Sequence, residues 1–267
     1  MAIRYQTEGF VAIITLDAPE SLNALAIADL KDLRKTLRSC QDDDRIRVIV
    51  LTGAGDRAFC TGANLKATLP PSTGFATGVL KSRDAETELG GYTRLIDLSD
   101  LEVWKPIVAA INGHCLGGGL ELALQCDLRI AADHASFALP EAKVASIPAV
   151  GGVQYLLRAV AAAHAMKMAL TGERIDAEQA LRIGLVSDLM PREALMSTAL
   201  DIAGRIAANG PLAVQTIKKL AAQTAHLAPR DFVAQSNLHW GLLRDSEDRI
   251  EGRRAFAEKR TPAYRGA

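Results

Sequence analysis

The sequence has no excess of charge of either sign. Its 267 residues include 31 basic and 31 acidic side chains, so the formal net charge at neutral pH is zero. A strongly basic protein would be attracted to nucleic acid or to an anionic membrane, and this balance provides no such attraction. The composition therefore predicts neither nucleic acid nor a membrane surface as a partner.

The sequence also lacks the common metal, redox and nucleophile motifs. None of its four cysteines forms a C-x-x-C pair, no H-x-x-x-H or Cys/His cluster is present, and there is no G-x-S-x-G elbow. We therefore expect buried, reduced thiols and no metal. His114, although it lies in a glycine-rich segment, is interpreted as a packed or solvated histidine.

A targeting or membrane-spanning segment is not evident either. The N-terminus has no charged start followed by an apolar core and a small-residue cleavage site. The most apolar stretch, residues 107–124, is interrupted by Asn112, His114, Glu121 and glycines, so it is a poor membrane span. These features predict a cytoplasmic location.

Short apolar runs alternate with helical patterns in the first half of the chain, which is 49% hydrophobic overall. Strands are predicted over 10–16, 46–51, 107–111 and 128–131, and the spacing of Ile27, Leu30, Leu33 and Leu37 predicts one helix face. Residues 68–91 are predicted to form a surface loop leading into a helix that ends near Trp104. From about residue 153 the pattern is helical, and the last seventy or so residues contain no strand pattern. This order predicts an α/β core followed by helices.

Three segments have compositions suited to chemistry. In residues 58–66, Gly62 and Ala63 would let a ligand approach the backbone. In residues 112–122, three consecutive glycines precede Glu121, and a helix starting there would present free N–H groups. Because the phosphate-binding patterns are absent, a site for a developing oxyanion is the better interpretation.

The third segment, residues 136–141, ends in Pro140 and Glu141, and is followed by a Gly151-Gly152 pair. The proline disfavours helix in the residue before it, so Glu141 is predicted to begin a new turn. Taken singly, Glu121 and Glu141 are each typical of an ordinary first-turn glutamate. They are 20 positions apart, so they can meet only if the fold brings two elements together.

Together these segments resemble the crotonase, or enoyl-CoA hydratase/isomerase, superfamily over nearly the whole chain. The resemblance implies a spiral of ββα units over residues 1–195 and a helical trimerisation region over 196–267, usually assembled as a hexamer, a dimer of trimers. The matching motifs are Pro19–Leu25, Gly62–Ala63, Gly117–Glu121, Leu170–Arg174 with Ala180 and Gly184–Val186, and Asp245–Asp248 with Glu251–Gly252 and Ala255–Arg260.

The resemblance implies roles for individual residues. Glu121 and Glu141 would be catalytic, and the N–H groups of Ala63 and Gly118 would form the oxyanion hole. Asn64 departs from the aspartate that is common in the family and removes a charge near the coenzyme A loop, and the proline-rich stretch after Lys66 leaves the preferred acyl length open. The implied coenzyme A contacts are Ala24, Ala63, Asn64, Leu65, Lys66, Phe256 and Lys259, the last two often from a neighbouring subunit.

Because both glutamates are present, the resemblance predicts an enoyl-CoA hydratase that adds water syn to a 2-enoyl-CoA thioester. No cofactor is implied, since coenzyme A is part of the substrate. Within the family, hydration coupled to thioester hydrolysis, as in methylthioacryloyl-CoA hydratase, carnitinyl-CoA-type dehydration and double-bond isomerisation remain alternatives. A coenzyme A-binding or RNA-binding relative with little catalysis is a further alternative, against which the neutral charge and the two glutamates argue.

Overall fold

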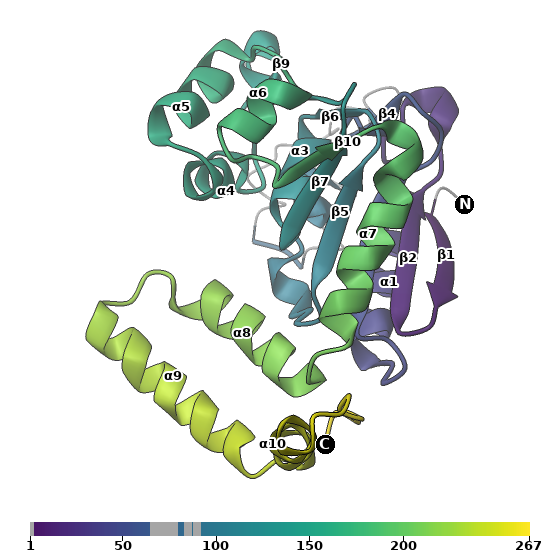
Figure 1. Cartoon of the computed structure of the whole chain (residues 1–267). Helices are drawn as coiled ribbons and strands as arrows, with labels where there is room; N and C mark the ends of the chain where they lie inside the picture. The colour runs from purple at the N-terminus through teal and green to yellow at the C-terminus, as the bar shows by residue number, and fades with distance from the viewer. Residues whose placement is uncertain (1–2, 65–79, 83–86, 88–91) are drawn as a thin grey trace.

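Two β-sheets, built mainly from parallel strands, form the body of the chain, which we define as residues 3–207 (Figure 1). The structure is a computed structural model and describes residues 3–64, 80–82, 87 and 92–267. The larger sheet has the order β1(Ile3–Glu8), β2(Val11–Leu16), β3(Val48–Gly53), β5(Ile107–Ile111), β7(Leu128–Ala132), β10(Asp188–Met190). The smaller sheet has the order β4(Ala58–Cys60), β6(His114–Leu116), β8(Ser136–Ala138), β9(Ile175–Asp176).

Successive strands along the chain alternate between the two sheets. Strand β3 is followed by β4, β5 by β6, and β7 by β8, so each turn of the chain adds one strand to each sheet. Helix α3(Gly118–Leu124) follows β6, and helix α4(Gly152–Ala159) follows β8 after the 3-10 turn η6(Glu141–Val144). The predicted α/β class is confirmed, and this repeat of strand, strand and helix is the one expected of a ββα spiral.

The core lies on both faces of the larger sheet. Along β3, Ile49 and Leu51 belong to one buried cluster and Val48 and Val50 to another, because successive side chains of a strand point to opposite faces. Burial on both faces explains why the strand is continuously apolar. The first cluster includes the predicted helix face of α1(Ile27–Asp42), and the second is covered by α7(Arg192–Ala207).

Two expectations need correction, and a third cannot be compared with the structure. Strands β9 and β10 fall in a region where only helices were predicted, and they are too short, at two and three residues, to show an alternating pattern. Before Trp104 the described residues form two 3-10 turns, η4(Tyr92–Ile96) and η5(Ser99–Leu101), rather than a continuous helix. Most of the predicted 68–91 loop lies outside the described residues.

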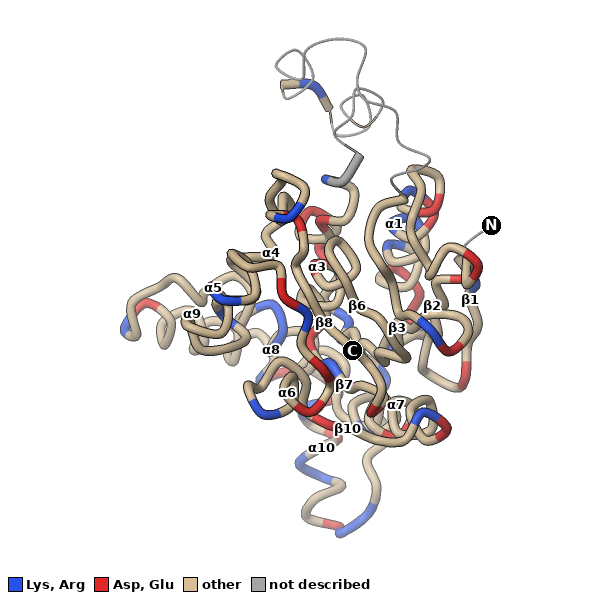
Figure 2. Tube along the Cα trace, turned by 90° about the horizontal axis from the view of Figure 1, so that it is seen from above, with Lys and Arg blue, Asp and Glu red and all other residues tan. Residues whose placement is uncertain are grey.

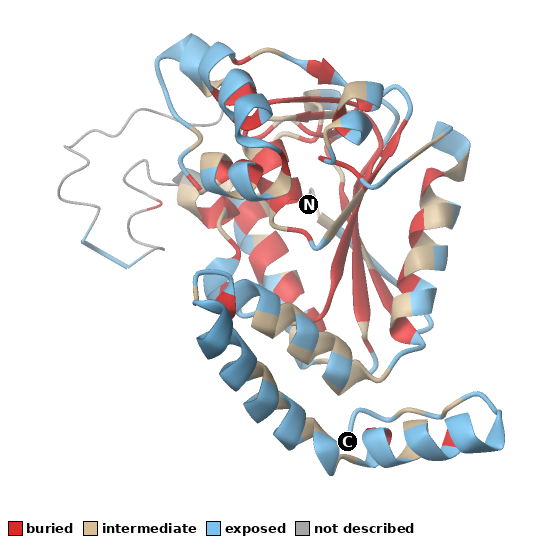
Figure 3. Ribbon diagram, turned by 60° about the vertical axis from the view of Figure 1, so that its left-hand side comes forward, coloured by how far each residue is buried: buried red, intermediate tan, exposed pale blue. Residues whose placement is uncertain are grey.

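Beyond the body, three helices form an extension that we call the C-terminal arm: α8(Pro211–Thr224), α9(Pro229–Arg244) and α10(Glu247–Glu258) (Figure 1). Figure 3 shows that the central strands of the body, such as β3 and β5, are buried and that α9 is largely exposed. The predicted boundary at residue 195 lies inside α7, whose later residues Ala199 and Ala203 also pack on the larger sheet. The helices α5(Ala162–Thr171) and α6(Ala177–Arg182) complete the body.

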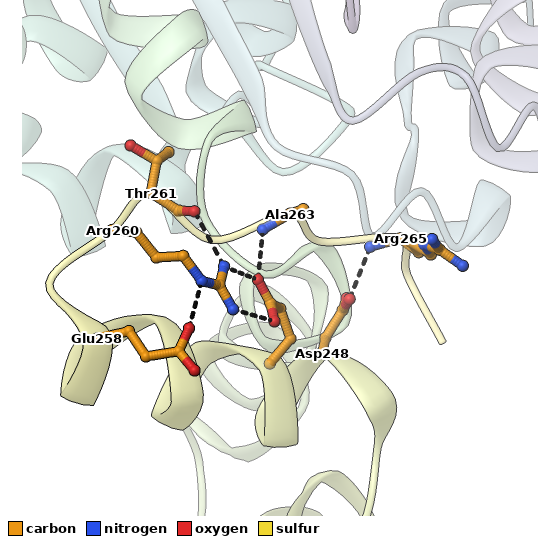
Figure 4. Close-up of polar contacts among 7 residues, drawn as sticks. Asp248, Glu258, Arg260, Thr261, Ala263 and Arg265 are labelled. Atoms are coloured by element: carbon orange, nitrogen blue, oxygen red, sulfur yellow. Dashed lines mark hydrogen bonds and ion pairs between the residues drawn. The ribbon is translucent and has the colours of Figure 1, made fainter.

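The C-terminal residues fold back along α10 (Figure 4). Arg260 donates to Glu251 at 2.6 and 2.9 Å, and Asp248 accepts from the backbone N–H of Arg265 at 2.7 Å. Arg47, from the body, donates to the carbonyl oxygen of Tyr264 at 2.7 Å. These contacts tie the end of the arm to the base of the larger sheet.

The distribution of charged residues along the chain agrees with the balanced composition. In Figure 2 acidic and basic residues are interspersed along the chain. In the described ranges no helix combines the length and the apolar character that crossing a membrane requires.

Candidate functional site

Three neighbouring parallel strands of the smaller sheet end at one edge, and each is followed by a segment that the sequence singled out. Gly62 and Ala63 follow β4, Gly117 and Gly118 follow β6, and Glu141 follows β8. Adjacent strands lie about 4.8 Å apart, so their carboxyl ends hold the three segments side by side. Residues far apart in the sequence therefore meet at this edge.

Two backbone N–H groups lie next to each other here. A Cβ built on Gly62 would lie 2.9 Å from the nitrogen of Gly118, and one built on Gly118 would lie 3.8 Å from the nitrogen of Ala63. The φ angles of Gly62 and Gly117, +90° and +53°, are left-handed and turn the chain at both strand ends. Within the described residues, no hydrogen bond is donated by the N–H of Ala63 or of Gly118. The pair is thus available to one acceptor.

Glu121 lies in the first turn of α3 and is 3% exposed. Its Oε1 accepts hydrogen bonds from the N–H groups of Val150, at 2.9 Å, and Gly152, at 3.0 Å. Burial raises the pKa of Glu121 to about 7, and the nearby charge of Glu141 adds to the rise, while the two backbone hydrogen bonds oppose it. The carboxyl group is therefore fixed in place and titrates near neutral pH.

Glu141 is the second carboxyl group at this edge. Its Oε1 lies close to Gly117, where an added Cβ would be 3.0 Å away, and burial raises the pKa of Glu141. Its Oε2 is buried without a hydrogen-bond partner among the described residues. A buried polar atom without a partner is costly, typically about 1–3 kcal/mol, so it is a strong indication of a site that a reactant completes.

The two glutamates, 20 positions apart in sequence, are brought together because β6 and β8 are paired. Sequence reasoning missed that Val150 and Gly152 hold Glu121. The signal was the Gly151-Gly152 pair: a Cβ on Gly152 would lie 2.8 Å from both Cγ and Oε1 of Glu121, so only glycine leaves room for that carboxylate.

The predicted early loop reaches the same edge. Leu25 donates to the carbonyl of Gly62 at 2.8 Å, and Asn64 donates to the carbonyl of Leu25 at 3.0 Å, which places Ala24 beside the Gly62-Ala63 segment. A residue that the sequence did not single out holds this loop: Asn23 is buried, and its Nδ2 donates to the carbonyls of Ala54 and Ala58.

Four predicted coenzyme A contacts remain to be placed. Leu65 and Lys66 lie outside the described residues. Phe256, which is 88% exposed, and Lys259 lie at α10, at the opposite end of the chain from α3 (Figure 1). Both residues therefore belong to the arm, whereas Glu121 belongs to the body.

Other polar groups near the edge have structural partners. His114 shares a 2.8 Å hydrogen bond with Ser136 across the β6–β8 pair, and burial lowers its pKa. All four cysteines are buried and unpaired. Among the described residues, no three His, Cys, Asp or Glu side chains are grouped so as to hold a metal ion.

Comparison with known proteins agrees with this geometry. A family model described as enoyl-CoA hydratase/isomerase matches residues 6–267. The chain is 45% identical over 267 residues to (E)-benzylidenesuccinyl-CoA hydratase of Thauera aromatica, covering 100% of both chains. It is 38% identical over 271 residues to carnitinyl-CoA dehydratase of Proteus mirabilis, covering 99% of this chain and 98% of that one.

A solved structure of enoyl-CoA hydratase from Bacillus anthracis matches with a TM-score of 0.89 and 34% identity, covering 100% of both chains. The relatives named here share the addition or removal of water as their reaction. The chain belongs to the enoyl-CoA hydratase/isomerase family and is a hydro-lyase within it.

Proposed function

We propose that the protein is an enoyl-CoA hydratase, which adds water across the double bond of a 2-enoyl-CoA thioester. The observation that carries this proposal is the meeting of two carboxyl groups, that of buried Glu121 and that of half-buried Glu141, beside two adjacent N–H groups that have no partner among the described residues. Hydration of an enoyl thioester requires a base, an acid and stabilisation of an enolate-like oxygen, and this arrangement can supply all three.

The N–H groups of Ala63 and Gly118 would bind the thioester carbonyl oxygen. Attack at C3 moves negative charge onto that oxygen, and fixed donors stabilise the charge as it develops. Loss of one such donor typically lowers kcat by about 10²–10³-fold. The glycines on either side are therefore part of the proposal, since side chains there would displace the donors.

Glu121 would take a proton from the attacking water, whose oxygen bonds to C3, and Glu141 would deliver a proton to C2 on the same face, giving syn addition. A base with a pKa near 7 is well matched to neutral pH, and burial favours the protonated form of Glu141. The two groups titrate as a coupled pair, so the pH profile belongs to the pair. No cofactor is required by this scheme.

We further propose that the protein works as a homo-oligomer, a hexamer built as a dimer of trimers. The arm exposes large apolar side chains that no described part of the chain covers, including Ile217, Leu238, Trp240 and Leu242. Association through the arm would also allow Phe256 and Lys259 to reach the coenzyme A of a neighbouring subunit. Ala24 and residues 63–66 would contact the coenzyme A bound within the same chain.

The direction and the extent of the reaction have specific alternatives. The relatives named carnitinyl-CoA dehydratase favour the removal of water from a 3-hydroxyacyl-CoA as a second candidate, and the same two carboxyl groups would serve it. The relative that is 45% identical makes benzylidenesuccinyl-CoA a substrate worth testing. Thioester hydrolysis after hydration would release a free thiol, and isomerisation would return a shifted double bond.

The test is the hydration of crotonyl-CoA, followed by loss of the enoyl absorbance and by product analysis. Glu121→Gln and Glu141→Gln should each lower kcat by about 10²–10⁴-fold, the usual contribution of a positioned acid or base. Glu193→Gln is the matched control, because Glu193 is an exposed first-turn glutamate of α7. Near wild-type turnover by both site variants would refute the two-carboxylate mechanism, and a free-thiol assay on the same samples detects hydrolysis.

A further inference from the structure

A polar cavity of about 400 Å³ lies beside the proposed site. Val150 and Gly151 form part of its wall, and the N–H of Val150 is one of the two that hold the carboxylate of Glu121. On another side the wall includes Arg94 and Asp97, from the segment around η4. The cavity therefore shares the Val150-Gly151 backbone segment with the site that holds Glu121.

The η4 segment links the cavity to the proposed carbonyl site as well. Ile96 packs directly on Gly118, where an added Cβ would lie 2.6 Å from its Cδ1. Arg94 and Asp97, on either side of it, line the cavity. An acyl group with its carbonyl at Gly118 and its C3 at Glu121 would thus have this cavity as a neighbouring space for substituents beyond C3.

Among the described residues that line the cavity, two are arginines and one is a carboxylate. Arg158, in the last turn of α4, is exposed and makes no hydrogen bond or ion pair within the described part of the chain. Arg94 contributes a second guanidinium to the wall. Asp97 is the carboxylate among the described lining residues, and its Oδ1 accepts from the N–H of Ser99 at 2.9 Å.

Tyr155 fixes the wall between Arg158 and the loop that holds Glu121. Its N–H donates to the carbonyl of Gly151 at 2.8 Å, and its ring lies so close to Gly151 that an added Cβ would be 2.8 Å from a ring carbon. Burial raises the pKa of Tyr155, Asp97 adds to the rise and Arg158 opposes it, which places the three polar groups near one another.

We propose that this cavity is a subsite for a carboxylate carried by the acyl group of the substrate, with Arg158 as its main cation and Tyr155 as a positioning residue. The proposal rests on the proposed function, because it needs the enoyl thioester at Gly118 and Glu121. A guanidinium binds a carboxylate through two parallel hydrogen bonds, whereas an aliphatic tail placed there would desolvate the polar wall without replacing its hydrogen bonds.

The test compares two substrates that differ only at the distal end of the acyl group: trans-2-hexenedioyl-CoA, which ends in a carboxylate, and trans-2-hexenoyl-CoA, which ends in a methyl group. The readout is the ratio of their kcat/KM values. The wild-type protein should favour the carboxylate, and Arg158→Gln should lower the ratio by about 10–100-fold, the usual range for a hydrogen-bonded charge pair. Arg158→Lys, which keeps the charge, should restore part of the ratio.

The matched control is Arg182→Gln, which removes the same charge from an exposed last-turn position of α6 outside the cavity. It should leave the ratio as in the wild type. An equal ratio in the wild type, Arg158→Gln and Arg182→Gln would overturn the subsite while leaving the hydratase proposal intact.

A binding measurement keeps the subsite testable even if no enoyl-CoA is hydrated, the outcome that would defeat the proposed function. Calorimetric titration with adipoyl-CoA and hexanoyl-CoA gives the same comparison without chemistry. Tighter binding of adipoyl-CoA by the wild type, with the difference lost in Arg158→Gln, supports the subsite. Equal affinities in the wild type overturn it.

Discussion

The helices α7 and α9 both have 16 residues but lie in opposite surroundings. Helix α7 buries Leu195, Ala199, Ala203 and Ala207, at four-residue steps, on the larger sheet. Helix α9 buries none of its residues and exposes Leu238, Trp240 and Leu242. Helix α7 therefore packs its apolar face within the chain, and helix α9 does not. We interpret the body as the part that carries the chemistry and the arm as the part that requires another surface.

The largest effect is expected where the body is most tightly packed. A Cβ added at Gly119 would lie closer to the carbonyl oxygen of Cys60 than the 3.0 Å that real Cβ atoms keep, and neither backbone can yield without separating α3 from β4. Gly119→Ala should lower the free energy of unfolding by about 3 kcal/mol or more and abolish hydration. Urea denaturation measures the first quantity and the crotonyl-CoA assay the second. An unchanged midpoint would show that α3 and β4 are less tightly coupled than their contact indicates.

Opposite pKa shifts sharpen the comparison between the two regions. The pKa of Glu121 is raised to about 7 by burial, whereas hydrogen bonds from exposed Arg260 lower that of Glu251 to about 2. A raised folded-state pKa stabilises the protein fully below the ordinary value of 4.5, and this contribution is lost as the pH rises through about 7. A lowered folded-state pKa, as at Glu251, stabilises the protein above the ordinary value of 4.5, and this contribution is lost as the pH falls through about 2.

We therefore expect wild-type unfolding free energy to fall by on the order of 2 kcal/mol between about pH 5 and pH 8, relative to Glu121→Gln. Hydration should fall in the opposite direction, as the pH drops below about 7, because protonated Glu121 cannot accept a proton. Urea titrations of the wild type and the variant, with initial rates at the same pH values, test both. Parallel stability profiles for the two proteins would contradict the assigned burial of charge.

In the arm, substitution of an exposed aromatic side chain should weaken self-association and leave folding unchanged. Trp240 is 56% exposed in the single chain, and aromatic residues often dominate interfaces. Trp240→Glu should weaken self-association by about 2 kcal/mol, seen by light scattering as a smaller species, while circular dichroism stays unchanged. Gln235→Glu, also on α9 and exposed, is the control. A monomeric wild type would refute the oligomer proposal.

The smallest effect on stability is expected from substitution of a helical glycine in the arm. Gly241 is also in a helix, but an added Cβ would meet nothing within 4 Å. Gly241→Ala should raise the unfolding free energy of α9 by about 0.5–1 kcal/mol, since alanine is the better helix former. Hydrogen exchange of the α9 amides measures this. A loss of assembly on the same substitution would show that the open space at Gly241 is used by another subunit.

The sequence predicted those parts of the fold in which burial produces a recognisable hydrophobic pattern, either a helical repeat or a continuous apolar run. The helix face of Leu30, Leu33 and Leu37 and the continuous runs of β3 and β5 are confirmed because each is buried against one or two layers. Strands of two or three residues, such as β9 and β10, leave no period and were missed.

The sequence could identify the candidate site residues, but it could not show how they are arranged in space. Glycine patterns identified the segments around Ala63, Gly118 and Glu121, but local sequence could not reveal that β4, β6 and β8 are neighbours. For the same reason the sequence did not reveal that the N–H groups of Val150 and Gly152 donate to Glu121, because these hydrogen bonds join residues 29 and 31 positions apart. The assignment of Phe256 and Lys259 to coenzyme A stays a prediction, because it needs a second chain.

The order of the three segments along the smaller sheet has a consequence for how such a protein can change. Successive turns of the chain contribute Gly62-Ala63, then Gly117 to Glu121, then Glu141. Under the proposed mechanism the polarising donors come from two turns and the C2 proton from a third. A single mutation at Glu141 would thus retain the machinery that makes a thioester reactive while changing where its protons go. A substitution in one of the three segments can therefore change the reaction while the other two segments and the fold stay as they are.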